Sequence, residues 1–454
     1  MLTIREIIKA VNGQVISEVK TGLVAGVSTD SRTVQPGELF IAIKGEKFDG
    51  HAFVNEVAQK GVSVMLVSED VVCPRKIVVI KVKDTTQALG DLARYYRSKF
   101  DIPVIAVTGS VGKTTTKDMI AEVLSTRYQA LKSAKSFNNQ FGVPLTILKL
   151  RKEYRVLILE LGTNHKGEIA GLARIAAPTI CVFTAIGESH LEGLGSELGV
   201  FREKSQMVKF MRSNGVVVYN ADNKFLRKLA SDKYHFSRVS YSVAQKSDYQ
   251  AEHIQQQENI SFTVQNKKFI LNDPVIHNVY NALAALVCGK LLKVPDDAIQ
   301  NGLKKFKNPD GRQNFYAINK SMVIDDTYNA NPVSYRSAVA TLGQWPAGLK
   351  KIMVCGDMLE LGEGSAEQHR SVGEAINETD IDAVVTLGEG AAFIGQAVKK
   401  LNSKKVYICQ TLQQIEARLK LLCAKSNAVV LVKGSRGMKM ERVVDFLKQY
   451  FKTL

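Results

Sequence analysis

The chain has 454 residues, enough for two to four domains that each bury their own core. Its 45% hydrophobic and 23% charged residues are ordinary for a globular protein, and its longest apolar run, residues 175–186, is too short to cross a bilayer about 30 Å thick. The net charge of +17 suits a nucleic-acid partner, but the basic residues are scattered and form no aromatic-basic stripe; anionic small substrates explain the balance about as well, and no nucleic acid is expected.

The cysteines stand singly inside apolar runs and show no C-x-x-C spacing, which is typical of reduced packing residues in a cytoplasmic protein. They are Cys73, Cys181, Cys288, Cys355, Cys409 and Cys423. The first thirteen residues carry apolar side chains at helical spacing instead of a continuous signal core. We therefore expect a cytoplasmic chain without membrane insertion.

Residues 1–100 predict a mixed α/β region with strands at 39–43, 64–67 and 77–79 and a helix at 85–98. Two polar stretches, 28–32 and 44–51, combine small hydroxyls, Asp, Arg and Lys with neighbouring Gly turns. Such residues suit a polar pocket on loops, although composition alone favours ordinary turn chemistry.

The strongest motif begins at residue 102, where an apolar β-branched run leads through a glycine-containing loop into Lys113 and Thr114 at the head of a helical pattern. This order is typical of a nucleotide phosphate site, because loop and helix N–H groups converge on an anion, Lys113 adds charge and the Thr114 hydroxyl can ligate Mg²⁺. Val107 stands where the usual G-x-x-x-x-G-K-S/T pattern has its first glycine, so a plain glycine turn is the alternative. The residues predicted to bind ATP here are Thr108, Gly109, Ser110, Val111, Gly112, Lys113, Thr114 and Thr115.

From 101 to 308 the alternation of strands and helices predicts a wound, mostly parallel sheet. Strands at 156–159 and 180–184 are followed by Glu160 and His190, and ligands gather at such strand ends. A carboxylate and an imidazole beside Thr114 could hold a divalent ion that bridges phosphates, or they could be a solvated glutamate and a hydrogen-bonded histidine.

Two further segments of this region are less specific. Residues 249–271 alternate as a small antiparallel insert without evident chemistry. Asn278 and Asn281 open an Ala-rich helix after His277, where they could face a nucleotide or cap the helix.

From residue 309 a βα rhythm predicts a Rossmann-like five-stranded sheet with strands at 322–324, 351–354, 383–386, 406–408 and 429–432. It lacks G-x-G-x-x-G, so dinucleotide binding is not indicated. Polar clusters follow three of its strands, at 325–332, 356–362 and 433–436. They predict a second ligand surface facing the phosphate loop.

These segments together resemble the Mur ligases, ATP-dependent amide-bond ligases that build the peptide of peptidoglycan precursors. The resemblance rests on ordered motifs: residues 108–115, Glu160, His190, residues 277–278, residues 311–312 and Asp326. The stretches 160–169, 325–332 and 356–362 are most similar to the member that joins D-alanyl-D-alanine to UDP-N-acetylmuramoyl-tripeptide, and the D-N-P-R signature of the diaminopimelate-adding member is absent.

The resemblance implies an α/β fold of three domains. They are a mixed α/β N-terminal domain for the UDP-sugar at 1–100, a central P-loop-type ATPase domain with a wound, mostly parallel sheet at 101–308, and a C-terminal Rossmann-like domain at 309–454 that binds D-alanyl-D-alanine and closes over ATP. It also implies a bacterial cytoplasmic enzyme that uses ATP and Mg²⁺, and a monomer is expected.

Site residues follow from the same resemblance. Those implied in substrate binding are Ser28, Asp30, Ser31, Arg32, Lys44, Gly45, Phe48, Asp49, Asn138, Asn139, Gln140, Asn164, His165, Asn331 and Lys433. The nucleotide set gains Asn278, Asn281, Arg312, Asp326, Tyr328 and Asn329. The catalytic set is Lys113, Glu160, His190, Lys204 and Arg312, and the metal ligands are Thr114, Glu160, His190 and Lys204.

Lys204 aligns with a lysine that several family members carry as a carbamate, although its neighbours depart from the family's commoner pattern. The implied chemistry is an acyl phosphate formed on the tripeptide carboxylate and displaced by the dipeptide amine. Another ligase of the superfamily, such as the diaminopimelate-adding enzyme or a folylpolyglutamate synthase, is the nearest alternative, and a P-loop kinase or NTPase is a more distant one. Whether the tripeptide ends in diaminopimelate or lysine stays open.

Overall fold

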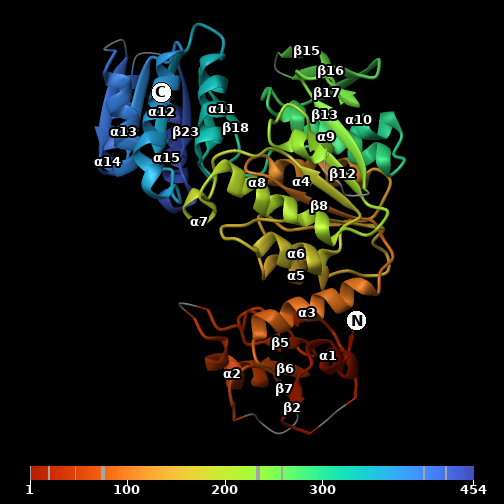
Figure 1. Ribbon diagram of the computed structural model, residues 1–454. Coiled ribbons are helices and arrows are strands. Elements are labelled where there is room, and N and C mark those ends of the chain that lie inside the picture. Colours follow the sequence, from red (N-terminus) through yellow and green to blue (C-terminus); the bar gives the residue numbers. More distant parts are fainter. Residues whose placement is uncertain are drawn as a thin grey trace.

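Three α/β domains follow one another along the chain in the computed structural model (Figure 1). The structure describes residues 2–18, 21–45, 48–72, 77–231, 236–256, 259–401, 404–424 and 427–453. Three sequence-based predictions, the packing role of Cys73 and the pocket roles of Glu46 and Lys47, fall outside these ranges. The α/β, three-domain class predicted from the sequence is confirmed.

The N-terminal domain contains a five-stranded sheet in the order β2-β7-β6-β5-β4, parallel except for β2. Its strands are β2 (Gln14–Val15), β4 (Val27–Ser28), β5 (Leu39–Ile41), β6 (Val64–Val67) and β7 (Val78–Lys81), and a separate pair joins β1 (Leu2–Thr3) to β3 (Leu23–Val24). The helices are α1 (Ile4–Val11), α2 (Val54–Gln59) and α3 (Thr85–Ser98). Strands β5 and β6 are buried throughout, as expected for apolar parallel strands.

The central domain holds a seven-stranded, fully parallel sheet in the order β14-β13-β12-β11-β8-β10-β9. Its strands are β8 (Val104–Thr108), β9 (Ala130–Lys132), β10 (Val156–Glu160), β11 (Ile180–Phe183), β12 (Val216–Asn220), β13 (Ser237–Ser242) and β14 (Tyr249–Gln250). Strand β8 lies inside the sheet between β11 and β10, and every residue of it is buried, so the loop that follows leaves the sheet at a fixed point.

Alternate residues of the central strands point into two different cores. One core packs against α4 (Lys113–Ser125), α9 (Asn278–Leu291) and α10 (Asp296–Lys305). The other packs against α5 (Gly142–Ile147), α6 (Glu168–Ala176), α8 (Glu197–Ser205) and also α3 of the N-terminal domain. The short helix α7 (Leu191–Leu194) precedes α8. Helix α3 therefore belongs to a core that is continuous between the first two domains. Figure 1 shows α3 between the N-terminal sheet and helices α5 and α6.

The antiparallel insert predicted at 249–271 is present as a three-stranded sheet of β15 (Glu252–Gln256), β16 (Ile260–Val264) and β17 (Lys267–Leu271). Its predicted start is wrong, because Tyr249–Gln250 pairs with β13 as the edge strand of the central parallel sheet.

The C-terminal sheet has six strands in the order β18-β19-β23-β20-β21-β22. These are β18 (Asn314–Ile318), β19 (Ser321–Asp326), β20 (Lys350–Gly356), β21 (Ala383–Leu387), β22 (Lys405–Cys409) and β23 (Ala428–Lys433). The prediction of five strands missed β18, an antiparallel edge strand whose residues are all partly or fully exposed and which therefore lacks a buried apolar run. The flanking helices are α11 (Pro332–Gly343), α12 (Ser365–Asn377), α13 (Glu389–Lys399), α14 (Leu412–Cys423) and α15 (Glu441–Thr453).

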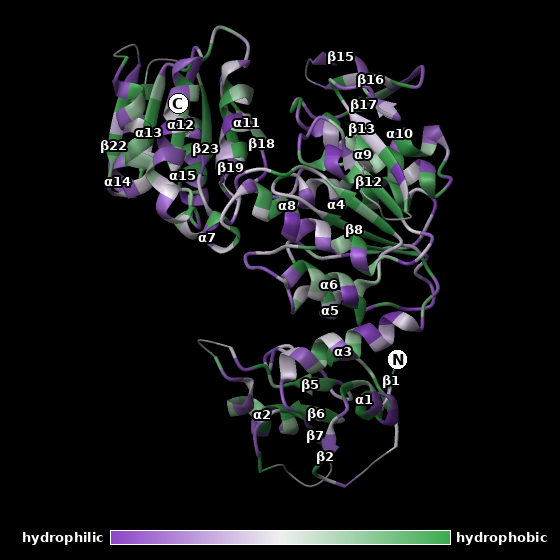
Figure 2. Ribbon diagram, viewed as in Figure 1, coloured by the Kyte–Doolittle hydropathy of each residue, from purple (hydrophilic) through white to green (hydrophobic). Residues whose placement is uncertain are grey.

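Strands in the middle of the larger sheets, such as β8 and β23, are hydrophobic, whereas helix surfaces alternate between hydrophobic and hydrophilic residues (Figure 2). Within the described residues, no helix is both long and apolar enough to cross a membrane. The cysteines of the described ranges are buried and unpaired.

Candidate active site

The phosphate loop lies between β8 and α4 and is shaped by two glycines. A Cβ on Gly109 would lie 2.0 Å from Thr184 Oγ1, and Gly112 has a φ of 82°, which side chains other than Gly rarely adopt. Lys113 Nζ donates a hydrogen bond to the Gly109 carbonyl oxygen, 2.8 Å away. The lysine thus folds back over the loop, and burial lowers its pKa.

Side chains at the end of β11 hold the loop in place. The Ser110 hydroxyl donates to the Gly187 carbonyl at 2.9 Å, and the Ser189 hydroxyl donates to Ser110 Oγ at 2.8 Å. Thr184 Oγ1 donates to the Val111 carbonyl at 2.5 Å. Sequence reasoning missed Ser189 and Thr184, whose position at the end of the strand beside β8 was the available signal. These bonds fix the loop conformation within the protein itself.

A pocket between the central and C-terminal domains gathers the predicted nucleotide residues. Its lining includes Ser110, Val111, Gly112, Lys113, Thr114, Thr115, Asn278, Asn281, Arg312, Asp326, Tyr328 and Asn329. Of the predicted set, Gly109 does not line the pocket, and Thr108 is buried at the strand end, where its hydroxyl donates to the Leu161 carbonyl at 2.8 Å.

Arg312 connects the two domains at this pocket. Its Nη2 donates to Thr114 Oγ1 at 3.1 Å, and its guanidinium carbon lies 4.4 Å from the centre of the Tyr328 ring. Its buried Nε has no hydrogen-bond partner among the described residues. The Tyr328 hydroxyl also bonds to Ser136 of the central domain. The arginine therefore already reaches the hydroxyl beside Lys113.

Asn278 and Asn281 brace the pocket instead of capping α9, whose first turn has no side-chain cap. Asn281 Oδ1 accepts from the Thr116 hydroxyl at 2.8 Å, and its Nδ2 donates to Asn278 Oδ1 at 2.7 Å. Asn278 Nδ2 donates to Asp273 Oδ2 at 2.8 Å. Burial raises the pKa of Asp273 to about 6. No sequence signal marked Asp273, because it lies outside every motif.

Two buried groups beside the phosphate loop lack partners. Glu160 Oε1 accepts from Asn138 Nδ2 at 2.9 Å, but its buried Oε2 has no partner within the described ranges. The same holds for Lys204 Nζ, which is fully buried. Burial, reinforced by the charge of Lys113, lowers the pKa of Lys204 well below its usual value. An unpaired buried carboxylate oxygen and an unpaired buried amine are both unfavourable unless a ligand completes them.

His190 does not line the pocket that contains Lys113 and Arg312. It directly precedes α7 with a φ of 51°, and its Nδ1 is 2.7 Å from Oε2 of Glu360 in the C-terminal domain. This bond lowers the pKa of Glu360. Glu188 makes further bonds to the same domain, to Arg336 Nη2 at 2.7 Å and Gln368 Nε2 at 3.2 Å. These contacts hold the C-terminal domain against the end of β11.

Two predicted substrate residues have structural partners. Asn331 caps α11 by accepting from the Ser334 N–H at 2.8 Å. Lys433 lines the pocket between the central and C-terminal domains and is buried, where its Nζ donates to Asp326 Oδ2 at 2.7 Å and to the Asn329 carbonyl at 3.0 Å. Lys433 thus also orients Asp326.

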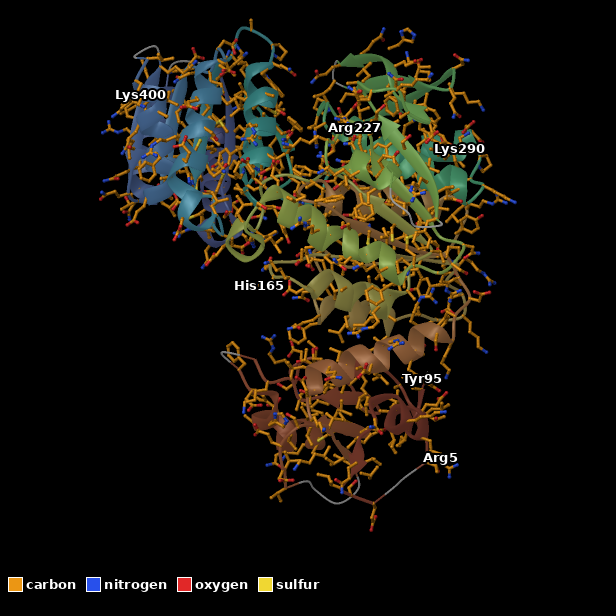
Figure 3. The ribbon with its side chains drawn as sticks, viewed as in Figure 1. Arg5, Tyr95, His165, Arg227, Lys290 and Lys400 are labelled. Carbon is orange, nitrogen blue, oxygen red and sulfur yellow. The ribbon has the colours of Figure 1, made fainter. Side chains whose placement is uncertain are left out.

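A second cavity, of about 790 Å³, lies between α3 and the central domain. The predicted substrate residues Asn138, Asn139, Gln140 and Asn164 line it. His165 lies outside this lining, at the edge of the central domain (Figure 3). The cavity reaches the residues beside the phosphate loop, because Asn138, which lines the cavity, donates a hydrogen bond to Glu160.

Apart from Ser28, which ends β4, the predicted residues of the N-terminal domain lie on loops beside its sheet. Ser28 Oγ accepts from the Asp30 N–H, and Arg32 Nη2 donates to Asp30 Oδ2 at 2.7 Å, which lowers the pKa of Asp30 to about 2. Ser31 is buried, Gly45 bonds to the Phe48 carbonyl, and the Phe48 residue is 78% exposed. The exposed ring leaves an apolar surface for a ligand.

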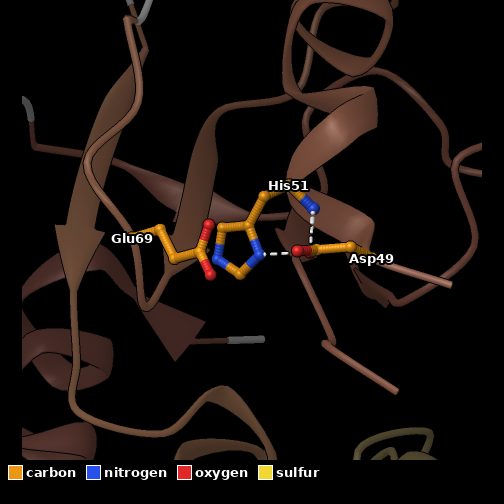
Figure 4. A group of neighbouring side chains, drawn as sticks. All are labelled: Asp49, His51 and Glu69. Carbon is orange, nitrogen blue, oxygen red and sulfur yellow. Dashed lines mark hydrogen bonds and ion pairs between the residues drawn. The ribbon is translucent and has the colours of Figure 1, made fainter. Parts of the chain in front are cut away.

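Asp49, His51 and Glu69 form a cluster with metal-like spacing (Figure 4). His51 Nδ1 lies 2.6 Å from Asp49 Oδ1, and His51 Nε2 accepts from the Ser68 N–H at 2.9 Å. Lys44 pairs with Glu69 at 2.5 Å. Because both ring nitrogens are engaged and Lys44 already supplies a cation, the cluster is a hydrogen-bond network and not a metal centre.

Comparisons with known proteins cover almost the whole chain. Family models match residues 23–97 (Mur ligase family, catalytic domain), 107–289 (Mur ligase middle domain) and 311–436 (Mur ligase, glutamate ligase domain). The chain is 35% identical to the UDP-N-acetylmuramoyl-tripeptide--D-alanyl-D-alanine ligase of Bacillus subtilis, over 98% of both chains. It is 36% identical to that of Escherichia coli, over 93% of both.

Solved structures agree with these relatives. A crystal structure of MurF from Acinetobacter baumannii superposes with a TM-score of 0.91 at 32% identity, over 98% of both chains. MurF from Thermotoga maritima in complex with ADP has a TM-score of 0.83 at 28% identity, over 94% of this chain and 98% of that one.

Proposed function

The chain belongs to the Mur ligase family, and on that premise we propose that it joins D-alanyl-D-alanine to UDP-N-acetylmuramoyl-tripeptide at the expense of ATP. Members of this family form amide bonds with ATP. The observation that carries the proposal is the pocket in which Lys113 of the phosphate loop and Arg312 of the hinge converge, in a chain aligned over nearly its whole length with ligases of that specificity.

ATP would bind with its phosphates on the loop at residues 109–115 and its nucleoside toward Asp326, Tyr328 and Asn329. All three residues line the same pocket as Lys113, and the relative from Thermotoga maritima was solved with ADP. The loop N–H groups and Lys113 would neutralise the phosphate charge.

In the first step, an oxygen of the tripeptide's terminal carboxylate attacks the γ-phosphorus, and the bond to ADP breaks. Negative charge grows on the transferring group, where Lys113 and Arg312 would stabilise it. In the second step, the dipeptide amine attacks the carbonyl carbon of the acyl phosphate, and inorganic phosphate leaves. Closure of the C-terminal domain over the pocket would exclude water that could otherwise hydrolyse this intermediate.

The residues beside the loop fit a divalent cation. Glu160 offers a buried, partnerless carboxylate oxygen, and Thr114 and His190 add a hydroxyl and an imidazole. Such oxygen and nitrogen donors suit Mg²⁺ at phosphates. When bound, it would supply positive charge to the phosphate oxygens. His190 would have to leave Glu360 to take part, which a change of domain orientation would allow.

Lys204 would act as a carbamate. Its buried amine has no partner among the described residues and a strongly lowered pKa, and the neutral amine is the form that adds carbon dioxide with loss of one proton. The resulting carboxylate would be a further ligand for Mg²⁺. A high-resolution density map with a plain amine at full occupancy would refute this role.

The UDP-sugar would occupy the polar loops of the N-terminal domain around Ser28, Arg32, Lys44 and Phe48, and the peptide would extend past residues 138–140 toward Glu160. D-Alanyl-D-alanine would approach from the C-terminal domain.

The test is release of ADP and phosphate from ATP and Mg²⁺ with UDP-N-acetylmuramoyl-tripeptide, with and without D-alanyl-D-alanine, followed by the product mass. We expect release to require the dipeptide, and a product heavier by one dipeptide less water. If ADP release requires a different amine, the chain is a ligase of this family with another amine specificity. If ADP release is independent of any amine, the chain is an ATPase or kinase and not a ligase.

A further inference from the structure

The cavity between α3 and α6 is a polar recess that the mechanism above uses only at one end. Asn138 and Gly162 form the end beside Glu160. The other end lies between the two helices, where Asp91 and Arg94 of α3 face Gly171 and Arg174 of α6. A group entering from the reaction site can therefore extend into the space between the domains.

The two helices present matching faces to this recess. Gly90 of α3 packs close to Ile175 of α6, since a Cβ on Gly90 would lie 3.0 Å from Ile175 Cδ1. Asp91 and Arg94 are neighbours at helical spacing beside this contact. On α6, a Cβ on Gly171 would meet no atom within 4 Å, so the recess is open there.

Several charged groups of the recess are unpaired. The side chains of Asp91, Arg94, Lys166 and Arg174 make no hydrogen bond or ion pair with any described residue. The other two carboxylates are already engaged: Asp84 accepts from the Gln87 N–H at 2.9 Å, and Glu168 accepts from the Asn164 and His165 N–H groups. The backbone N–H groups that start α6 are engaged too, because Glu203 accepts from Gly167 and Ile169. The free charged groups are thus two guanidinium groups, the Lys166 ammonium and one carboxylate.

We infer that this recess selects the side chain of the tripeptide's last residue, and that this residue is a diamino dicarboxylic acid, the diaminopimelate form, instead of lysine. Arg94 and Arg174 bind the distal carboxylate, and Asp91 binds the distal ammonium. A lysine side chain would satisfy Asp91 but leave both arginines without a partner. The inference rests on the proposed function, because it concerns the substrate of that reaction.

The experiment compares two substrates that differ only in the distal carboxylate: UDP-N-acetylmuramoyl-tripeptides ending in meso-diaminopimelate or in lysine. Dipeptide-dependent ADP release gives kcat/KM for each substrate, with the wild type, Arg94→Ala, Arg174→Ala and the control Arg5→Ala. Arg5 is an exposed residue of α1 in the N-terminal domain, outside the lining of the recess (Figure 3). Contacts with the parts that both substrates share contribute equally to the two kcat/KM values, so their effect cancels in the ratio.

We expect the wild type and Arg5→Ala to prefer the diaminopimelate substrate by roughly 30-fold or more, since charged groups built for a carboxylate discriminate against its absence. Arg94→Ala and Arg174→Ala should each lower this ratio about tenfold, through slower use of the diaminopimelate substrate alone. Equal use of both substrates by the wild type, or an equal loss on both in the variants, would overturn the inference and leave the ligase function standing. If neither substrate supports dipeptide-dependent release, the proposed function itself fails.

A second variant tests occupancy of the recess without changing charge. Gly171→Leu places a side chain in the open space of α6, where the helical backbone tolerates it. We expect at least a roughly fivefold rise in the KM for the tripeptide and an unchanged KM for ATP. Gly364→Leu, at an equally open glycine of the C-terminal domain, is the matched control. An unchanged tripeptide KM in Gly171→Leu would contradict a peptide in this recess.

Discussion

The central and C-terminal domains both rest on parallel sheets, yet each buries a lysine in a different way. Lys433 of the C-terminal domain is buried with two partners, Asp326 Oδ2 and the Asn329 carbonyl. Lys204 of the central domain is buried with no partner among the described residues. A buried charge that is paired supports the fold, whereas a buried amine without a partner destabilises it and indicates a group that a ligand or modification completes.

The largest effect is expected for the lysine of the phosphate loop. Lys113→Ala removes its charge. We expect kcat/KM to fall roughly 10³-fold or more, because a charge aimed at the transferring phosphoryl group is lost. The folded state should be unaffected, since Lys113 makes one hydrogen bond, to its own loop. Steady-state ADP release and a thermal melt give the two readouts, and wild-type release would remove the loop from the catalytic site.

The second test is Lys433→Met in the C-terminal domain. It leaves Asp326 buried without its cation, which should lower the free energy of unfolding by about 3 kcal/mol. Lys351→Met is the matched control, because the partner of Lys351, Asp380, has a side chain 66% exposed and can return to water. Denaturant unfolding of both variants measures the difference, and equal losses would show that burial of the partner does not matter.

The third test is Lys204→Met in the central domain. Stability should rise by about 1 kcal/mol, because an unpaired buried amine is replaced by an apolar side chain. Turnover should fall roughly 30-fold if the lysine carries a metal ligand. The control is Lys117→Met. Lys117 Nζ donates to two carbonyl oxygens at 2.9 Å, and the substitution leaves both without this donor, so the variant should be less stable than the wild type. A destabilised Lys204→Met would mean that the amine has a structural partner.

The smallest effect is expected for an exposed pair. Glu6 accepts from Thr3 and pairs with Lys99, and the Lys99 contact lowers the pKa of Glu6 from 4.5 to about 2. Because the folded pKa lies below the unfolded one, the carboxylate stabilises the fold above about pH 4.5, and this contribution is lost as the pH falls toward 2. Glu6→Gln should cost about 1 kcal/mol at pH 7, after allowance for solvent screening, and only a small part of that near pH 2, where about half of the carboxylate is protonated in the folded state. Unfolding at both pH values measures it, and a cost independent of pH would point to lost packing instead.

The sequence predicted well what depends on local pattern. The strand, glycine loop and helix at residues 102–116 are adjacent in the chain, so their periodicity predicts both the fold and the phosphate site. Glu160 was proposed from the same kind of pattern, because it stands at the end of a buried apolar strand.

What the sequence did not predict depends on remote partners or on weak local patterns. Glu360 bonds to His190 across 170 positions of the chain, and Asp273 acts through Asn278 and Asn308 without a motif of its own. Strand β18 was not predicted, because an exposed edge strand lacks the buried apolar run that marks a strand in the sequence. The polar stretch at 44–51 suited a loop pocket, and only the structure shows that both ring nitrogens of His51 within it are already engaged.

The bonds between Glu188 and Arg336, and between His190 and Glu360, fix one orientation of the C-terminal domain relative to the phosphate loop. Since the nucleotide pocket is lined from both domains, the affinity for nucleotide and the equilibrium between domain orientations are thermodynamically coupled. The coupling is reciprocal: a substitution at Arg336 that shifts the orientation equilibrium changes nucleotide affinity by the factor with which bound nucleotide shifts that equilibrium in return. Natural variation at this surface could thus tune the enzyme's response to cellular nucleotide without altering any residue of the pocket.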